Sequence, residues 1–262
     1  MHDSYLPDPG PEALAPDIAA EFLLVRVSAI ASAFILVACE SENVSQESDS
    51  ARRDSAVALT MVDGGAPKLP PRDEADESFR QFRSGALAAL AHRDTAFLYG
   101  MLAPEIRNTF GDDDGIAGFR RVWKMDEPNS DVWMALIRVL SMGGQQATDS
   151  QFTAPYVYAF WPDSMDAFEH VAVTGDSVRV QDAPAPDARI LGGAHHSILK
   201  FREWRGLPMS GVAADTTWAR IVLPNADTGW IRGASVYSPV SWRAMFVRRD
   251  GRWLMLLFVA GD

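Results

Sequence analysis

The sequence contains a single cysteine, Cys39, and only five histidines among its 262 residues. One cysteine excludes an internal disulfide framework, and so few thiols and imidazoles exclude a cysteine-rich zinc or iron–sulfur site. Basic residues are also in the minority, because 24 Lys and Arg stand against 35 Asp and Glu, which gives a net charge of −11. This acidic balance argues against a nucleic-acid partner. We therefore expect no metal, no cofactor and no nucleic acid.

Long hydrophobic runs are missing as well, although 47% of the residues are hydrophobic and 23% are charged. Such a composition supports a packed core of one or two domains. The run 27–38 reads VSAIASAFILVA and follows Arg26. It is too short to cross a membrane, which takes about 20 apolar residues, but its length is typical of a secretory signal peptide. We predict a signal peptide over residues 1–38. Residues 1–21 hold five acids and no Lys or Arg, so we expect translation to begin near residue 24 or 25.

The four residues Leu36-Val37-Ala38-Cys39 at the end of this run resemble the lipobox of bacterial lipoproteins. The resemblance implies that the leader is cut before Cys39 and that the Cys39 sulfur carries a diacylglycerol. Two or more acyl chains hold a protein firmly on a bilayer. The expected location is the cell envelope, facing the periplasm or the exterior, and Glu40 after the cysteine favours the outer membrane. The alternative is a buried hydrophobic helix with an ordinary cysteine.

Three segments follow the cysteine. Residues 39–76 are polar and rich in Gly and Pro, which predicts a flexible tether. Residues 77–150 carry apolar side chains at a spacing of three to four, which predicts a helical segment with one helix starting at Asp94-Thr95. Residues 151–262 are rich in β-branched residues and turns. The strands expected there are 154–161, 170–174, 177–181, 196–201, 217–222, 229–232, 242–248 and 252–260.

Two stretches of the strand-rich segment resemble the bacterial SH3 domain. Residues 171–184 read VAVTGDSVRVQDAP and residues 218–231 read WARIVLPNADTGWI. The likeness covers about 171–237 and implies an all-β SH3-like barrel. The predicted fold class is thus α+β: a small N-terminal helical segment, then an SH3-like barrel with an extra C-terminal hairpin. We expect that hairpin to pack beneath the helical segment. A helix-and-sheet cone of the SnoaL-like kind is the alternative for that portion.

The chain as a whole also resembles bacterial envelope proteins that pair a helical segment with an SH3-like segment. The likeness rests on 109–115 (TFGDDDG) with Phe119 and Trp123, on 154–156 (APY) and on the ending 251–262. This group carries no activity over to the present chain. No nucleophile elbow, phosphate loop or metalloprotease motif is present in the sequence, and we name no catalytic residue.

The candidate binding residues are Trp218, Trp230 and Tyr237, which lie on or beside the SH3-like strands. Aromatic rings in such a position line shallow grooves for extended peptides, and packing in the core is the competing interpretation. The expected function is that of a membrane-anchored, non-catalytic binding module for a peptide, a protein partner or the cell wall. Two alternatives remain. One is a small-ligand-binding protein or enzyme with a pocket between helices and sheet, and the other is a structural subunit of an envelope complex.

Two polar clusters are interpreted as structural. Residues 112–115 read DDDG, but an EF-hand loop that starts at Asp112 would need Glu where Trp123 stands. A turn that leads into a helix N-terminus fits better. His195 and His196 are neighbours, so in a strand their side chains point to opposite faces. Neither cluster predicts a metal site.

Overall fold

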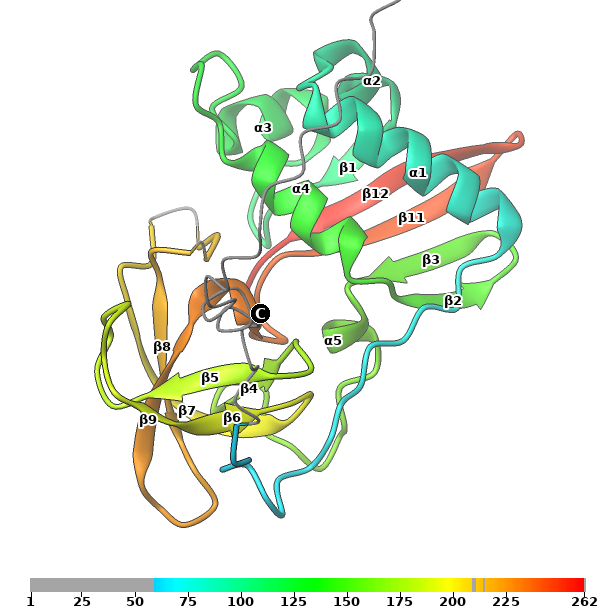
Figure 1. Ribbon diagram of the computed structural model, residues 1–262. Coiled ribbons are helices and arrows are strands. Elements are labelled where there is room, and N and C mark those ends of the chain that lie inside the picture. The colour runs from blue at the N-terminus through cyan, green and yellow to red at the C-terminus, as the bar shows by residue number, and fades with distance from the viewer. Residues whose placement is uncertain (1–58, 209–210, 214, 262) are drawn as a thin grey trace, which may run out of the picture. The chain divides into compact units, whose positions relative to one another are not determined.

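The computed structural model describes residues 59–208, 211–213 and 215–261. Residues 56–262 form one compact unit. The described residues have a mixed α+β fold with two sheets of mostly antiparallel strands (Figure 1), which confirms the predicted α+β class. The predicted signal peptide and Cys39 lie outside the described residues. Within the described residues no helix is both long and apolar enough to cross a membrane.

A five-stranded sheet is built from both ends of this unit, in the order β1-β12-β11-β3-β2. The last hairpin forms its centre, and β1 pairs with β12 in parallel. The strands of this sheet are β1 (Leu102–Arg107), β2 (Gln145–Thr148), β3 (Gln151–Ala154), β11 (Arg243–Arg249) and β12 (Arg252–Val259). The helices of the same part of the chain are α1 (Glu77–Ala91), α2 (Thr95–Gly100), α3 (Gly115–Val122), α4 (Val132–Ser141) and α5 (Tyr156–Ala159).

The first two helices begin where the sequence supplies a capping carboxylate. The Asp76 side chain accepts a hydrogen bond from the backbone N–H of Phe79 at 2.7 Å, and Asp94 accepts one from Phe97 at 2.9 Å. Each bond satisfies an amide that has no partner inside the helix. The helix predicted to start at Asp94-Thr95 is therefore confirmed, and its cause is the cap.

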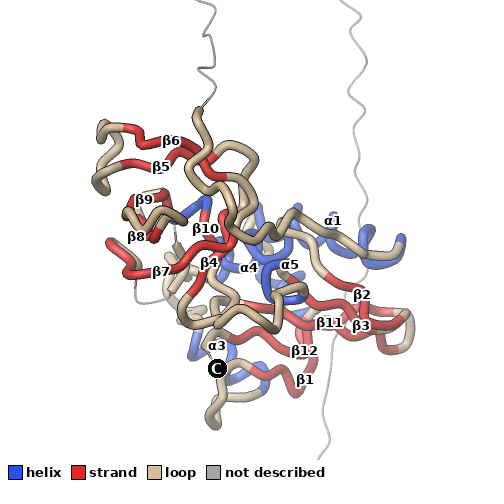
Figure 2. Tube along the Cα trace, turned by 90° about the horizontal axis from the view of Figure 1, so that it is seen from below, coloured by secondary structure: helices blue, strands red, loops and turns tan. Residues whose placement is uncertain are grey.

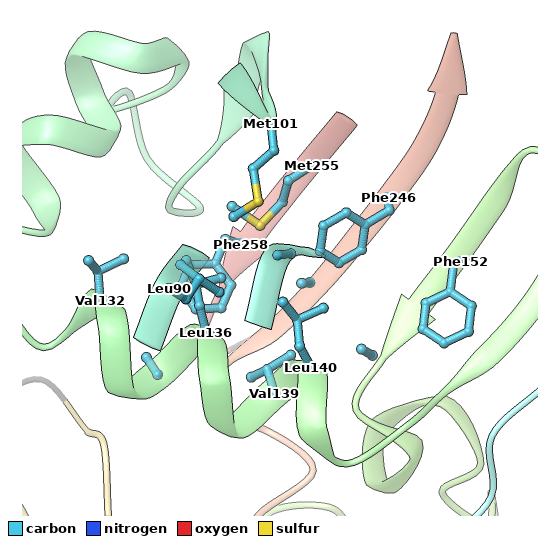
Figure 3. Close-up of a cluster of buried hydrophobic side chains, with 14 of the residues drawn as sticks. Leu90, Met101, Val132, Leu136, Val139, Leu140, Phe152, Phe246, Met255 and Phe258 are labelled. Carbon is cyan, nitrogen blue, oxygen red and sulfur yellow. The ribbon is translucent and has the colours of Figure 1, made fainter. Parts of the chain in front are cut away.

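An aromatic core joins the helices to the five-stranded sheet. The rings of Phe79 on α1 and Phe152 on β3 stack at 3.9 Å, and Phe246 on β11 meets Phe79 edge-on at 5.3 Å. Helix α4 lies beside α1, and its side chains point toward the same strands, as Figure 3 shows for Leu136 and Leu140. The C-terminal hairpin thus packs beneath the helical segment, as the sequence predicted.

The other sheet has seven strands in the order β10-β4-β7-β8-β9-β5-β6, and all its neighbours are antiparallel. Figure 2 shows it as a separate group of strands. It consists of β4 (His170–Val173), β5 (Val178–Gln181), β6 (Ile190–Ala194), β7 (Ile198–Arg205), β8 (Trp218–Val222), β9 (Thr228–Arg232) and β10 (Val236–Tyr237), with a 3-10 turn η1 (Gly233–Ser235) before β10. Among the described residues no pairing between β10 and β6 closes the sheet into a barrel.

The predicted strand 154–161 is wrong. Strand β3 ends at Ala154, and Tyr156–Ala159 form the helix α5. Pro155 lies between them; it has no N–H to continue the sheet, and it precedes the first turn of the helix. The strand β6 was not predicted, because its two glycines weaken the strand pattern. Gly192 is needed there, since a Cβ at this position would lie 2.4 Å from the carbonyl oxygen of Thr60.

Residues 59–76, which the composition assigns to the tether, run along the seven-stranded sheet. Met61 forms a bridge with Gly193, and Lys68 forms one with Ser197. The Asp63 carboxylate is buried and pairs with the Lys68 ammonium at 2.7 Å. This part of the chain is therefore attached to the folded unit. The tether prediction for residues 39–58 lies outside the described residues.

Candidate functional site: an arginine–tryptophan face

Two of the three predicted binding residues lie together on one face of the seven-stranded sheet. Trp218 on β8 is opposite Arg232 on β9, and Trp230 on β9 is opposite Arg220 on β8. Residues two apart on a strand point to the same side, so these four side chains share a face. Arg205 on β7 is opposite Trp218 and joins them. We call these five residues the arginine–tryptophan face.

Both tryptophan rings are covered by guanidinium groups. The Arg232 guanidinium lies 4.8 Å from the centre of the Trp218 ring. The guanidinium groups of Arg205 and Arg220 lie 5.4 and 5.8 Å from the centre of the Trp230 ring. These distances are those of cation–π contacts. Trp218 and Trp230 are consequently only 5% and 8% exposed, although neither belongs to a hydrophobic core cluster.

The opposite face of these strands carries the aliphatic core of the sheet. Ala219 and Ile221 alternate with Trp218 and Arg220 along β8 and are fully buried. Ile231 does the same on β9. The alternation shows that the tryptophans point away from the aliphatic core, and arginine side chains cover them.

The arginines of the face have different partners. Arg220 forms an ion pair with Glu203 on β7 at 3.2 Å. Arg232 donates to the backbone oxygen of Asp215 at 2.8 Å. Within the described part of the chain, Arg205 is exposed and has no ion pair. The face therefore presents positive charge on a chain whose net charge is −11.

An open pocket extends this face toward β5. Its volume is about 420 Å³, and Arg232 lines it together with Arg179, Gln181 and Ser235. Asp176 also lines the pocket, but its carboxylate is 2.7 Å from Nε2 of His196. Positive charge therefore continues past the edge of the arginine–tryptophan face.

The third predicted residue, Tyr237, lies elsewhere. It is buried on β10, and its hydroxyl donates to the backbone oxygen of Trp242. Burial raises the pKa of the Tyr237 hydroxyl, so it stays protonated. The Arg138 guanidinium of α4 lies 5.1 Å from the centre of its ring. Tyr237 is therefore a packing residue where the helical segment meets the seven-stranded sheet.

Arg138 is a residue that sequence reasoning missed. Its guanidinium donates to the backbone oxygens of Gly233 at 2.8 Å and Val236 at 2.6 Å, and also to that of Ala213. Burial lowers the pKa of this guanidinium. It borders a pocket of about 210 Å³ that Tyr237 and Trp242 also line. One arginine in an apolar helix was the only signal in the sequence.

A larger pocket lies between α1, α2 and the β11–β12 hairpin. Its volume is about 490 Å³, and its lining includes the rings of Phe82, Phe97 and Trp253. Arg248 and Arg252 border it from the hairpin. This pocket combines an apolar wall with positive charge, and its place agrees with the expectation that the last hairpin packs beneath the helical segment.

The two polar clusters behave as structural elements. His195 donates its backbone N–H to Asp63 at 2.9 Å, and His196 pairs with Asp176. Asp114 precedes α3 and accepts from the backbone N–H of Asn108 at 3.2 Å. The described residues hold no group of three or more His, Cys, Asp or Glu side chains arranged to bind a metal ion.

Comparisons of this chain with protein-family models, with curated proteins and with solved structures find no match.

Proposed function

We propose that the chain is a lipid-anchored lipoprotein of the cell envelope that acts as a non-catalytic binding module. Acylation of Cys39 would fix one end at the membrane. The seven-stranded sheet would then recognise a peptide, a protein partner or the cell wall. The observation that carries this proposal is the arginine–tryptophan face, where two aromatic rings and three guanidinium groups lie side by side on one face of a sheet.

The mechanism is an increase in local concentration. A module held near a membrane meets a neighbouring ligand at an effective concentration set by the length of its connection. The described part of the chain begins at residue 59, and residues between it and Cys39 would serve as the connection. Modest affinity at the sheet is then sufficient for lasting contact.

We further propose that residues 171–237 form an SH3-like module. Support comes from the likeness of 171–184 and 218–231 to that family and from the antiparallel pairing of β7, β8 and β9. In this module Trp218 and Trp230 stand on adjacent strands, which places the guanidinium groups over both rings within reach of one extended ligand.

Metabolic labelling with radioactive palmitate tests the anchor. Cells that produce the full chain should incorporate label, and the protein should fractionate with membranes. The Cys39→Ser variant should lose the label and leave the membrane fraction. Label that persists in this variant, or an unlabelled full chain in the cytosol, would disprove the anchor.

Sedimentation with purified peptidoglycan tests the cell-wall form of the binding proposal. The wild-type chain should co-sediment, and Trp230→Ala should reduce the bound fraction. Phe168→Ala is the matched control, because Phe168 is 62% exposed and lies outside the arginine–tryptophan face. Equal behaviour of the two variants would remove the cell wall as the ligand, and cross-linking in whole cells would then identify a protein neighbour.

A second candidate function is the binding of a small molecule, and the pocket between α1, α2 and the last hairpin favours it. A volume of about 490 Å³ lies within the usual range of small-molecule sites. Aromatic walls with two bordering arginines fit a ligand that has apolar surface and an anionic group. Displacement of a fluorescent fatty acid, with Arg252→Gln weakening the binding, would support it. The absence of any displacement would reject it.

A further inference from the structure

We propose that the arginine–tryptophan face binds an acidic segment of a protein partner, in extended conformation, through the segment's carboxylates. This inference rests on the binding role proposed above and specifies its ligand. The argument uses the free donors of the arginines, their restraint by the tryptophan rings and their spacing.

The arginines retain donors for a ligand. A guanidinium has five N–H donors in one plane, which match a carboxylate in a two-pronged hydrogen bond. Within the described residues, Arg205 makes no ion pair, and the donation from Arg232 to Asp215 uses one terminal nitrogen, leaving donors free. Glu203 neutralises only Arg220. Two guanidinium groups are thus available to carboxylates from outside.

The tryptophan rings hold these groups in place before a ligand arrives. Arg205 reaches across β8 so that its guanidinium lies over Trp230, and Arg232 lies over Trp218. Stacking restricts side chains that are otherwise free to rotate, and binding therefore loses less conformational entropy. It leaves the N–H groups at the edges of each guanidinium plane able to donate.

The spacing of the face suits an extended peptide. Arg205 and Arg232 belong to strands two positions apart, which corresponds to about 10 Å between their backbones. Carboxylates two residues apart in an extended chain point to the same side and are separated by about 7 Å, a difference that the long side chains of Arg and Glu can span. The open pocket lined by Arg179 and Arg232 extends the face, and a chain that continues past Arg232 would enter it.

Two features favour a peptide over a membrane or a polyphosphate. Among the described residues, the large hydrophobic side chains that are exposed lie elsewhere, at Met61, Phe110, Ile116, Met134, Tyr158, Phe168 and Ile190. The face therefore offers no apolar group for insertion into a bilayer. Glu203 lies within the arginine array, and it would repel a continuous row of phosphates, whereas discrete carboxylates can avoid it.

The test uses the full chain with Cys39→Ser, so that binding is measured without acylation. The probe is a ten-residue peptide of alternating Glu and Ser with blocked ends, and the reference peptide carries Gln in place of Glu. Calorimetry should show binding of the Glu peptide that weakens with added salt. The Arg205→Gln, Arg232→Gln double variant should bind the Glu peptide at least about tenfold more weakly, since each charge-assisted hydrogen bond contributes strongly to the affinity.

The matched control is the Arg120→Gln, Arg121→Gln double variant, which removes the same charge from exposed positions on α3, away from both candidate sites. It should bind the Glu peptide as the wild type does. If Arg232→Gln disturbs the fold, as judged by circular dichroism, Arg205→Gln alone is compared with Arg120→Gln alone. Arg205 is exposed, so its removal leaves no buried group without a partner.

Three results would overturn the inference. The first two are no binding of the Glu peptide and equal weakening of binding in both double variants. The third is that the chain does not bind the peptide but binds vesicles with anionic lipid more strongly than neutral vesicles. These results are separable from failure of the proposed function. Palmitate labelling and co-sedimentation with the cell wall test that function without the peptide, and the peptide test needs no anchor.

Discussion

The two sheets use aromatic residues in opposite ways. At the five-stranded sheet, Phe79 of α1 and Phe152 and Phe246 of the strands are fully buried between helices and strands. In the seven-stranded sheet the core is aliphatic, and Trp218 and Trp230 lie on the outer face under arginine side chains. A helix layer covers one sheet, whereas arginines cover the other. The comparison shows that a buried tryptophan need not be a core tryptophan.

The largest expected effect comes from the aromatic core. Phe246→Ala should lower the free energy of unfolding by about 3–5 kcal/mol, because it removes a buried ring and leaves a cavity. Ile221→Val in the aliphatic core should cost about 0.5–1.5 kcal/mol. Urea unfolding of both variants checks the difference. A Phe246→Ala cost no larger than that of Ile221→Val would mean that the aromatic cluster is not the main support of the fold.

Arg138 connects the two regions, and its removal is the next largest effect. Arg138→Ala should cost about 2–4 kcal/mol, because each buried carbonyl left without a donor costs about 1–3 kcal/mol and water restores part of this. The carbonyl of Val236 loses the Arg138 donor, and that of Gly233 keeps only the backbone N–H of Val236. Arg252→Ala is the control, since exposed Arg252 also donates to a backbone oxygen, that of Gly100. Equal urea-unfolding midpoints of the Arg138→Ala and Arg252→Ala variants would show that Arg138 is not needed to join the regions.

Much of this architecture could be predicted from local patterns. The apolar spacing after residue 77 predicts α1, and the capping carboxylate of Asp94 predicts the start of α2. Alternation predicts β8 and β9, and the turn Asp250-Gly251 predicts the last hairpin. Each of these elements depends on residues that are close in the sequence, and short-range patterns are therefore sufficient to predict it.

What could not be predicted depends on distant partners. Strand β1 contains Pro104, which argues against a strand, yet it forms the edge of its sheet in parallel with β12. In the sequence Tyr237 lies on or beside the SH3-like strands, as Trp218 and Trp230 do, but the fold places it against Arg138 of α4. Arg205 became part of the candidate site through the register of β7 with β8. No pattern within one segment specifies these contacts.

A buried ion pair ties the segment before α1 to the seven-stranded sheet, and it should respond to pH. Asp63 is 1% exposed. Burial alone would raise the pKa of its carboxyl, but hydrogen bonds from Lys68 and from the backbone N–H of His195 outweigh burial and lower it. Stability from this pair is thus present above the unfolded pKa of about 3.8 and is lost as the pH falls through the lower folded value.

Asp63→Asn should therefore cost about 1–3 kcal/mol at pH 7, since it weakens a buried, charge-assisted network. The difference between variant and wild type should shrink as the pH falls below 4. Thermal unfolding across pH 2–7 measures it, and Asp187→Asn, an exposed position in the same region, is the control. A difference that stays constant down to pH 2 would contradict the assigned role of the Asp63 charge.

The smallest expected effect decides what the arginine–tryptophan face is for. A double-mutant cycle with Arg205→Gln and Trp230→Leu should give a coupling of about 0.5–1 kcal/mol in unfolding, the usual size of an exposed cation–π contact. Arg205→Gln alone should change stability by less than about 0.5 kcal/mol. A coupling above 2 kcal/mol would instead make the face a structural support. We expect Arg205→Gln to change stability little and still to weaken binding of the acidic peptide severalfold. That combination would show that the guanidinium is held over Trp230 for a ligand, because its contribution to folding is too small to account for its position.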